Sequence, residues 1–514
     1  MVVAALLAPL PASAQTAADA GAARAASRGY RQAHEGAIVR ELATLLAIPN
    51  LARDSAGIRA NADTLSAMLR RRGITTRLLE VPGAPPAVFG ELGVPGARRT
   101  VVLYAHYDGQ PVDARQWTTP PWSPTLRTRA LGDGGTVIPL PTAPDARLDP
   151  ESRIYARSAG DDKASIMAML AALDALRAAH ITPGVNIKLL LEGEEEAGSP
   201  HLGAILRQNA ALLSGDVLLL CDGPVHPSGK QELVFGVRGV TGLELTVYGP
   251  TRALHSGHYG NWAPNPAVLL SDLITSMRDD DGHVKIAHYY DDVRPLTATE
   301  RAAIAALPSS DSALRRSLGL ARTEANDAPL AERIMVPALN VRGIQSGAVG
   351  TQAANAVPTE ARASFDFRLV PAETPQRVRE LVNAHLRSRG YFVTSDSVTM
   401  TMRLAHPRVA RVQWDTAGYP ASRTVMDLPV SRALIAAVRD GTGTVPLVVP
   451  SMGGSAPAYL FEQALHLPVI IVPVANADDN QHAANENLRL GNLWNGIDLY
   501  AGVLARLGVD WPTR

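Results

Sequence analysis

The sequence predicts a mixed α/β fold, with a largely parallel sheet flanked by helices and a smaller α+β domain inserted into it. Short apolar runs that end in polar or charged residues occur at 100–106, 185–192, 216–222 and 467–475. Such continuous runs are typical of strands buried on both faces of an α/β sheet. Near Gly236 the pattern changes to alternating apolar and polar residues, which is typical of half-buried antiparallel strands.

The first residues predict export of the chain. Residues 1–15 read MVVAALLAPLPASAQ, a short apolar run followed by Ala12-Ser13-Ala14, which is typical of a signal-peptide cleavage site. The run is too short to cross a bilayer. We therefore expect a signal peptide at 1–14, a flexible lead-in at 15–29, and a protein that is exported, periplasmic or secreted. A disordered Ala-rich start is the alternative.

The first part of the larger domain is expected at 30–235, where strands and helices alternate. After the strand at 100–106, the segment DDKASIMAMLAALDALRAAH repeats apolar residues at helical spacing, and Pro183-Gly184 ends the helix. Strands at 185–192 and 216–222 follow with a helix between them. This βαβ order places the carboxyl ends of the strands together, where ligands of α/β sheets gather.

The smaller domain is expected at 236–415. Its segments GVRGVTGLELTVYG and TEARASFDFRLV alternate apolar and polar residues, and helical patterns lie between or after them. The larger domain resumes at 416–514 with the strand at 467–475 and a helix in GIDLYAGVLARLG. The stretches 127–152 and 279–330 are rich in Pro, Gly and charged residues and are predicted to be loop insertions.

Charge and cysteine content exclude several classes of function. The chain has 514 residues, with 49 Lys+Arg and 49 Asp+Glu, so its formal net charge is zero. That balance gives no whole-chain electrostatic reason to bind nucleic acid or an anionic membrane. The one cysteine, Cys221, cannot form an intrachain disulfide or a Cys-rich zinc site, and we expect it to be a core residue rather than a nucleophile. Any metal must therefore be held by His, Asp and Glu.

A run of four glutamates follows the strand at 185–192. The segment LLLEGEEEAGS places Glu192, Glu194, Glu195 and Glu196 within five positions, where they repel one another unless a cation lies between them. An isolated acidic run is usually a solvated loop. Here His106 and Asp222 end the neighbouring strands, so metal ligands converge on the same edge of the sheet. This convergence favours a metal site.

The candidate ligands are two histidines and three carboxylates. His106 has Asp108 two residues on, which is placed to hold the other ring nitrogen. Asp161 and Asp162 precede a helix, where an N-cap role is the alternative for Asp162. The remaining candidates are Asp222, the loop residue His482, and one of the adjacent Glu195 and Glu196, since the other would face a metal-bound water. Two His and three carboxylates suit two Zn²⁺ ions that share a water, and Mn²⁺ or Co²⁺ would also fit.

The sequence resembles the co-catalytic zinc metallopeptidases that include carnosine dipeptidase, aminoacylase and bacterial glutamate carboxypeptidase. The resemblance is carried, in the family's order, by HYDGQPVD, GDDK, EGEEEAGS, CDGP, LHSGHYG, DFRLVP, GGSAP and DDNQHAANE. These motifs span nearly the whole chain from about residue 30. The run DGQPVD…W…PPWSP is closer to the dipeptidase branch than to the deacylases.

The resemblance implies a role for each matching position. One zinc would be held by His106, Asp161 and Asp222, and the other by Asp161, Glu196 and His482, with a cis peptide after the bridging Asp161. Glu195 would be the general base, and Asp108 would support His106. Glu192 and Glu194 would either contact the ligands without binding a metal or lie exposed. His255 would reach across a dimer interface to the partner's active site and stabilise the oxyanion. Arg368 would bind the C-terminal carboxylate, with Gly454 and Ser455 in the same pocket.

The resulting expectation is a homodimeric enzyme that hydrolyses dipeptides or short peptides, with a metal-activated water as nucleophile and the smaller domain as lid and dimerisation domain. An N-acyl-amino-acid deacylase with the same metal site is the first alternative. A binding homologue without catalysis is the second, and it should lack ligands or the base, whereas every expected position is filled here. Neither nucleic acid binding nor membrane insertion is expected.

Overall fold

The chain forms two compact units in the computed structural model, which describes residues 12–509 and 511. One unit comprises Met1–Phe235, Thr424–Pro450 and Leu460–Arg514, and the other comprises Gly236–Arg423 and Ser451–Tyr459. Residues 1–11, which include most of the predicted signal peptide, lie outside the described part. The predicted boundary at 235/236 coincides with the observed one. The second boundary was predicted at 415/416, whereas the structure assigns residues up to Arg423, and again Ser451–Tyr459, to the smaller unit.

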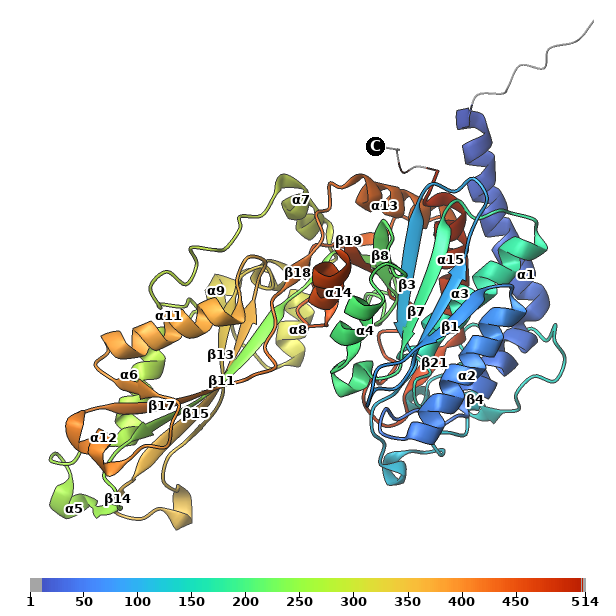
Figure 1. Ribbon diagram of the computed structural model, residues 1–514. Helices are drawn as coiled ribbons and strands as arrows, with labels where there is room; N and C mark the ends of the chain where they lie inside the picture. The colour runs from blue at the N-terminus through green and yellow to red at the C-terminus, as the bar shows by residue number, and fades with distance from the viewer. Residues whose placement is uncertain (1–11, 510, 512–514) are drawn as a thin grey trace, which may run out of the picture. The chain divides into compact units, whose positions relative to one another are not determined.

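An eight-stranded sheet forms the centre of the first unit (Figure 1). Its order is β1(Thr75–Leu79), β2(Ala87–Leu92), β7(Asn186–Glu192), β3(Thr100–His106), β8(Val217–Leu220), β20(Val469–Ile471), β9(Glu232–Val234) and β19(Leu447–Val449). The central strands β7, β3, β8 and β20 are parallel, whereas β1, β2 and the β20–β9 pair are antiparallel. This arrangement confirms the predicted mixed, largely parallel sheet.

Long helices cover this sheet. The helices α1(Ala12–Leu46), α3(Lys163–Ala178), α13(Pro429–Thr442) and α15(Leu490–Arg506) pack against one another, and α2(Ser55–Arg71) packs on β1 and β2. α3 is buried over most of its length, as expected for a helix that is apolar on nearly all sides. α4(Leu202–Gln208) and α14(Ala458–Leu465) are shorter, and a small sheet joins β21(Asn487–Arg489), β6(Arg153–Tyr155), β4(Thr125–Arg127) and β5(Val137–Ile138).

The predicted flexible lead-in at 15–29 is wrong, because these residues belong to helix α1. Ala23 and Ser27 are fully buried there. The Ser27 hydroxyl donates to Asp498 Oδ1 at 2.6 Å, and Arg28 forms an ion pair with the same carboxylate at 2.9 Å. Ser27 and Arg28 therefore link this part of α1 to Asp498 of α15.

The second unit is an α+β domain built on a five-stranded sheet. The strand order is β13(Ala338–Gln345), β15(Glu360–Leu369), β11(Gly239–Tyr248), β17(Val409–Trp414) and β16(Phe392–Thr394), and only the β16–β17 pair is parallel. Helices α6(Pro266–Met277) and α11(Pro375–Ser388) contribute to the hydrophobic core on one of its faces. Two-residue ladders join β10(Gly236–Val237) to β18(Ser422–Arg423), and β12(Leu254–His255) to β14(Ala356–Val357).

The stretch 279–330 contains more regular structure than the predicted loop insertion. It includes α7(Ala298–Ala306), α8(Asp311–Ser317) and α9(Glu324–Asp327). The first of these helices begins with a capping box, in which the Thr297 hydroxyl accepts from the Glu300 amide and the Glu300 carboxylate accepts from the Thr297 amide.

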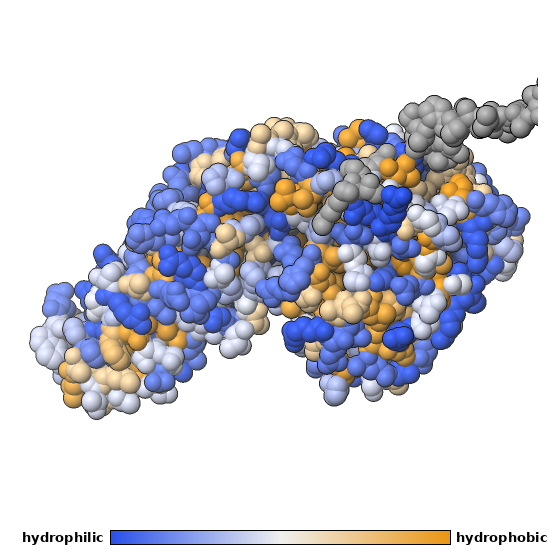
Figure 2. Space-filling model, turned by 45° about the horizontal axis from the view of Figure 1, so that its top comes forward, coloured by the Kyte–Doolittle hydropathy of each residue, from blue (hydrophilic) through white to orange (hydrophobic). Residues whose placement is uncertain are grey.

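None of the described helices is long and apolar enough to span a bilayer. Figure 2 shows hydrophobic residues interspersed among hydrophilic ones on the face in view.

Candidate metal centre

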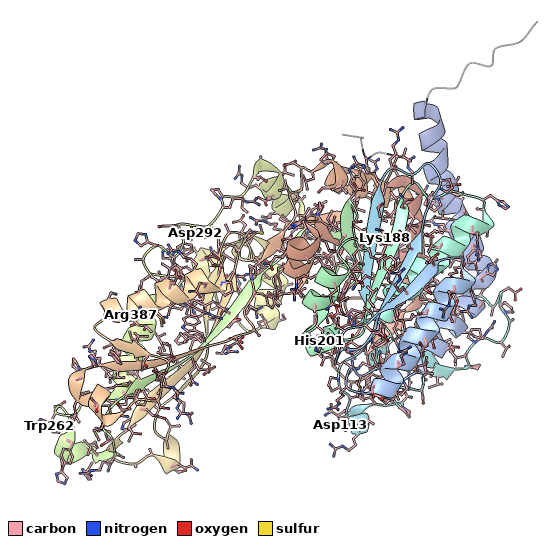
Figure 3. All side chains as sticks on the ribbon, viewed as in Figure 1. Asp113, Lys188, His201, Trp262, Asp292 and Arg387 are labelled. Carbon is pink, nitrogen blue, oxygen red and sulfur yellow. The ribbon has the colours of Figure 1, made fainter. Side chains whose placement is uncertain are left out.

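The predicted ligands of the first unit meet at one edge of the eight-stranded sheet. β3 ends at His106, β7 leads into the 3-10 turn η3(Glu195–Ala197), and Asp222 follows β8. Because these three strands are parallel neighbours, their carboxyl ends lie side by side. Figure 3 shows His201, just beyond the turn, at this end of the strands and Lys188 in the body of β7.

In the first group of ligands, His106 and Asp161 are buried and Asp222 is partly exposed. His106, Asp161 and Asp222 each offer one ligand atom, and these atoms lie within 4.8 Å of one another. His106 Nε2 lies 2.8 Å from Asp161 Oδ1 and 3.9 Å from Asp222 Oδ1. One imidazole nitrogen and two carboxylate oxygens thus surround a single point.

The second group shares Asp161 with the first. Asp161, Glu196 and His482 again bring one ligand atom each within 4.8 Å. His482 Nε2 lies 3.2 Å from Asp161 Oδ2 and 3.3 Å from Glu196 Oε2, and the His482 side chain is 55% exposed. Since Oδ1 of Asp161 faces His106 and Oδ2 faces His482, this carboxylate is placed to bridge two cations.

The electrostatics of these residues fit bound cations. Asp222 Oδ1 is buried and has no hydrogen-bond partner among the described residues. Burial and the Asp161 carboxylate raise the pKa of Glu196 to about 7 and that of Asp222 to about 6. Burial also opposes ionisation of Asp161, but His106 holds its pKa well below the usual range. Crowded carboxylates with an unpartnered buried oxygen and two imidazoles suit a pair of dications such as Zn²⁺.

Asp108 connects His106 to the turn that carries the glutamates. Its carboxylate is fully buried and accepts the backbone N–H groups of Glu195 and Glu196, each at 3.1 Å. Asp108 Oδ1 also lies 3.4 Å from His106 Nδ1, the ring nitrogen that faces away from Asp161. The predicted supporting role of Asp108 therefore extends to the placement of the glutamates, which sequence reasoning did not foresee.

The glutamates of the acidic run lie in different environments. Glu195 belongs to neither ligand group, and burial raises the pKa of its carboxyl well above the usual value. Glu192 and Glu194 are buried, which excludes the exposed alternative for them and agrees with a supporting role. Glu192 accepts the Tyr104 hydroxyl at 2.5 Å, and Glu194 accepts the His201 amide at 2.8 Å. Glu192 and Glu194 thus hold the segment on either side of Glu195 in place.

The loop that carries Asp161 is held by a buried glutamate that sequence reasoning missed. The Asp161–Asp162 peptide is cis, as the resemblance implied. Glu486 accepts the backbone N–H groups of Gly160 and Asp161, each at 3.0 Å, and forms an ion pair with Arg157 at 2.7 Å. Its place in the segment DDNQHAANENL, shortly after His482, was the one available signal.

Two glutamine amides contact the second group of ligands, and neither was predicted. Gln481 Nε2 donates to Asp161 Oδ2 at 2.8 Å, and Gln110 Nε2 donates to Glu196 Oε2 at 2.7 Å. Both lie within motifs that carry the family resemblance. The spacing of a glutamine in the sequence does not distinguish one that contacts a metal ligand from an ordinary loop residue. Their contacts orient two carboxylates that offer oxygens to a cation.

The remaining predicted residues belong to the second unit. Arg368 in β15 donates from Nη1 to Ser455 Oγ at 3.0 Å and from Nε to Asp366 Oδ2 at 2.8 Å. Gly454 adjoins Ser455 and accepts a backbone N–H through its carbonyl. His255 is exposed, and its Nδ1 accepts the Gly257 amide at 3.1 Å. The structure therefore brings Arg368 and Ser455 into contact, as the resemblance implied.

The chain matches known proteins over most of its length. A family model described as peptidase family M20/M25/M40 matches residues 102–506. The chain is 27% identical to a Cys-Gly metallodipeptidase of Schizosaccharomyces pombe, over 83% of this chain and 84% of that protein. It is 28% identical to the Beta-Ala-His dipeptidase of Homo sapiens, over 81% of this chain and 76% of that protein.

Solved structures show the same fold. An M20 family metallo-carboxypeptidase from Sulfolobus solfataricus matches with a TM-score of 0.71 at 28% identity, covering 92% of this chain and 99% of the other. Human carnosine dipeptidase 1 matches with a TM-score of 0.66 at 23% identity, covering 95% and 98%. At that identity the second match shows the fold alone.

Proposed function

Since the chain belongs to peptidase family M20/M25/M40, we propose that it is a metal-dependent dipeptidase that cleaves the peptide bond of dipeptides or short peptides. The main support for the proposal is the pair of ligand groups that share Asp161. The Glu195 carboxyl lies close enough for the charges of His106 and Asp222 to act on it, but it belongs to neither group. The curated relatives reported above are dipeptidases, which supports this substrate class.

The residues of the first unit fit a hydrolytic mechanism. Two dications, which we propose to be Zn²⁺, would lower the pKa of a bound water and polarise the scissile carbonyl. Glu195 accepts a proton from the attacking water and later donates it to the leaving amine nitrogen. Asp108 holds the backbone of Glu195 and orients the His106 ring, so it positions the base relative to a metal ligand.

The second unit supplies groups suited to substrate recognition. Arg368, whose guanidinium is fixed by Asp366 and Ser455, is proposed to bind the C-terminal carboxylate of the substrate, with Gly454 in the same pocket. We propose that His255 acts on the oxyanion of the partner subunit in a homodimer. The exposure of apolar side chains on this unit supports a dimer, since Trp262 is 78% and Val349 is 85% exposed.

Export of the protein is proposed from Ala12-Ser13-Ala14 and the apolar run before it.

The test is hydrolysis of a mixed panel of dipeptides and N-acyl amino acids by metal-reconstituted enzyme. Turnover of the dipeptides, lost on chelation and restored by Zn²⁺, Mn²⁺ or Co²⁺, is the expected result. Turnover of the acyl substrates alone would make the protein a deacylase with the same centre. Absence of metal-dependent turnover on both sets would contradict the proposal and favour a binding protein.

A further inference from the structure

One face of the five-stranded sheet carries polar side chains around Arg368. Residues on β15 and β11 alternate between faces, and Phe365, Phe367 and Leu369 belong to the hydrophobic core. Arg368 pairs with Val240 of β11. Arg238 lies two residues before Val240, just before β11 begins, and the charge of Arg368 acts on it. If the alternation continues by one residue beyond the strand, Arg238 lies on the same face, diagonal to Arg368.

Both arginines form hydrogen bonds to the segment Gly454-Ser455. The Arg238 amide donates to the Gly454 carbonyl at 3.0 Å. Arg368 Nη1 donates to the hydroxyl of the next residue, Ser455, at 3.0 Å. The strand register and these hydrogen bonds therefore both place the backbones of Arg238 and Arg368 close together.

The two guanidinium groups differ in their charge partners. Arg368 is paired with Asp366 at 2.8 Å, and the second oxygen of Asp366 accepts Asn340 Nδ2 at 2.7 Å. Arg238 instead donates from Nη2 to the Val336 carbonyl at 2.8 Å, and its Nε is buried without a hydrogen-bond partner. Among the described residues, no carboxylate lies within ion-pair distance of Arg238.

The charges around Arg238 do not balance its positive charge, because the neighbouring carboxylate of Asp366 is paired with Arg368. Burial, and then the neighbouring Arg368, lower the pKa of Arg238 to about 10. The other nearby carboxyl, Glu373, is buried and accepts the Val370 amide, and burial raises its pKa to about 7. A largely desolvated cation without an acid partner is costly, and an anionic ligand would remove that cost.

We infer that Arg238 and Arg368 together form a carboxylate-binding subsite, in which Arg238 supplies the uncompensated positive charge and Arg368, held by Asp366, supplies orientation. The inference rests on the proposed function, because the ligand is a carboxylate of the dipeptide. Two sources share this chemistry, namely the α-carboxylate of the C-terminal residue and the side-chain carboxylate of a C-terminal Asp or Glu. Guanidinium groups suit both, since they bind carboxylates through two parallel hydrogen bonds.

The test compares Arg238→Met with a matched control on three substrates. The control is Arg342→Met, because Arg342 belongs to β13 of the same sheet and its charge is already partnered by Glu244 at 3.3 Å. The substrates are Ala-Leu, Ala-Leu amide and Ala-Glu. We expect Arg238→Met to raise KM for Ala-Leu and Ala-Glu about 10- to 100-fold with kcat within about twofold, as for loss of a charged hydrogen-bond partner. The amide and the control should change by less than about twofold.

Each other outcome has a defined meaning. A rise in KM for Ala-Glu alone would keep the subsite and assign it to the side-chain carboxylate. An equal change for acid and amide, or unchanged KM for both acids, would overturn the inference. Arg238→Lys keeps the charge and should show a smaller rise in KM. It replaces Arg238→Met if circular dichroism shows that Arg238→Met does not fold.

If wild-type enzyme cleaves none of the dipeptides, the proposed function fails. Calorimetric titration of wild type and variant with Ala-Leu and its amide then tests the subsite alone, and equal binding of the two ligands would overturn it.

Discussion

The position of Asp108 predicts that a single-atom change will disturb both the metal ligands and the base. In Asp108→Asn an amide nitrogen replaces one carboxylate oxygen at a fully buried site. The wild-type oxygens accept the amides of Glu195 and Glu196 and face His106 Nδ1. Asparagine has one acceptor oxygen, so its NH₂ group must face one backbone N–H that it cannot accept.

The cost follows from the contacts that are lost. A hydrogen bond to a charged acceptor contributes about 1.5–3 kcal/mol, and a buried donor left without a partner costs about 1–3 kcal/mol. We expect Asp108→Asn to lower the free energy of unfolding of the metal-free protein by about 2–4 kcal/mol, since these terms overlap. His106 also loses the carboxylate behind its ring, which typically costs 10- to 100-fold in metal affinity.

Two assays separate these effects. Denaturant unfolding in the presence of chelator measures stability, and competition with a chromophoric chelator measures metal affinity. Asp113→Asn is the matched control, because the Asp113 side chain is 36% exposed and its carboxylate contacts Arg115, two residues on. The reasoning would be refuted if Asp108→Asn retained wild-type metal affinity and lay within about 0.5 kcal/mol of wild type in stability.

Two further predictions concern the second ligand group and a buried carboxyl of the second unit. Gln481→Ala removes the amide that orients Asp161. We expect about 10-fold weaker binding of one of the two metal ions, measured by calorimetry. Tighter binding would show that the amide competes with the metal. Glu373→Gln tests pH dependence. Because burial raises the pKa of Glu373 to about 7, its stabilising contribution is present below its unfolded pKa and is lost as the pH rises through about 7. Relative to wild type, the variant should gain about 3 kcal/mol of unfolding free energy between pH 5 and pH 8.5, and a constant difference across that range would contradict the assignment.

The catalytic unit could be predicted well from sequence because its signals are local. One continuous apolar strand ends at His106, and another ends just before Asp222. The strand that lies between these two in the sequence is followed by adjacent glutamates. Since parallel strands bring such ends together, chemistry and topology could be inferred from the same residues. The change in texture at Gly236 likewise marked the beginning of the second unit.

The features that were missed depend on tertiary contacts. In the helical segment at 15–29, Ser27 and Arg28 bind Asp498, a residue far along the chain, and the sequence gives no local signal for this contact. The second unit continues to Arg423, where β18 pairs with β10, and it also includes Ser451–Tyr459. A ladder of two residues has no periodicity that could be detected in the sequence. Gln481 acts through one contact with Asp161, which no spacing rule reveals.

The central claim is that Glu195 transfers protons at a centre whose metals are held by other residues. Its most direct test is turnover of a dipeptide by Glu195→Gln, with metal content measured in the same sample. We predict that the variant keeps two metal ions per chain and loses at least about 100-fold in kcat, which is typical for removal of a general base. Near-normal kcat with both metals bound would contradict the role of Glu195, and loss of metal would show that Glu195 is a ligand.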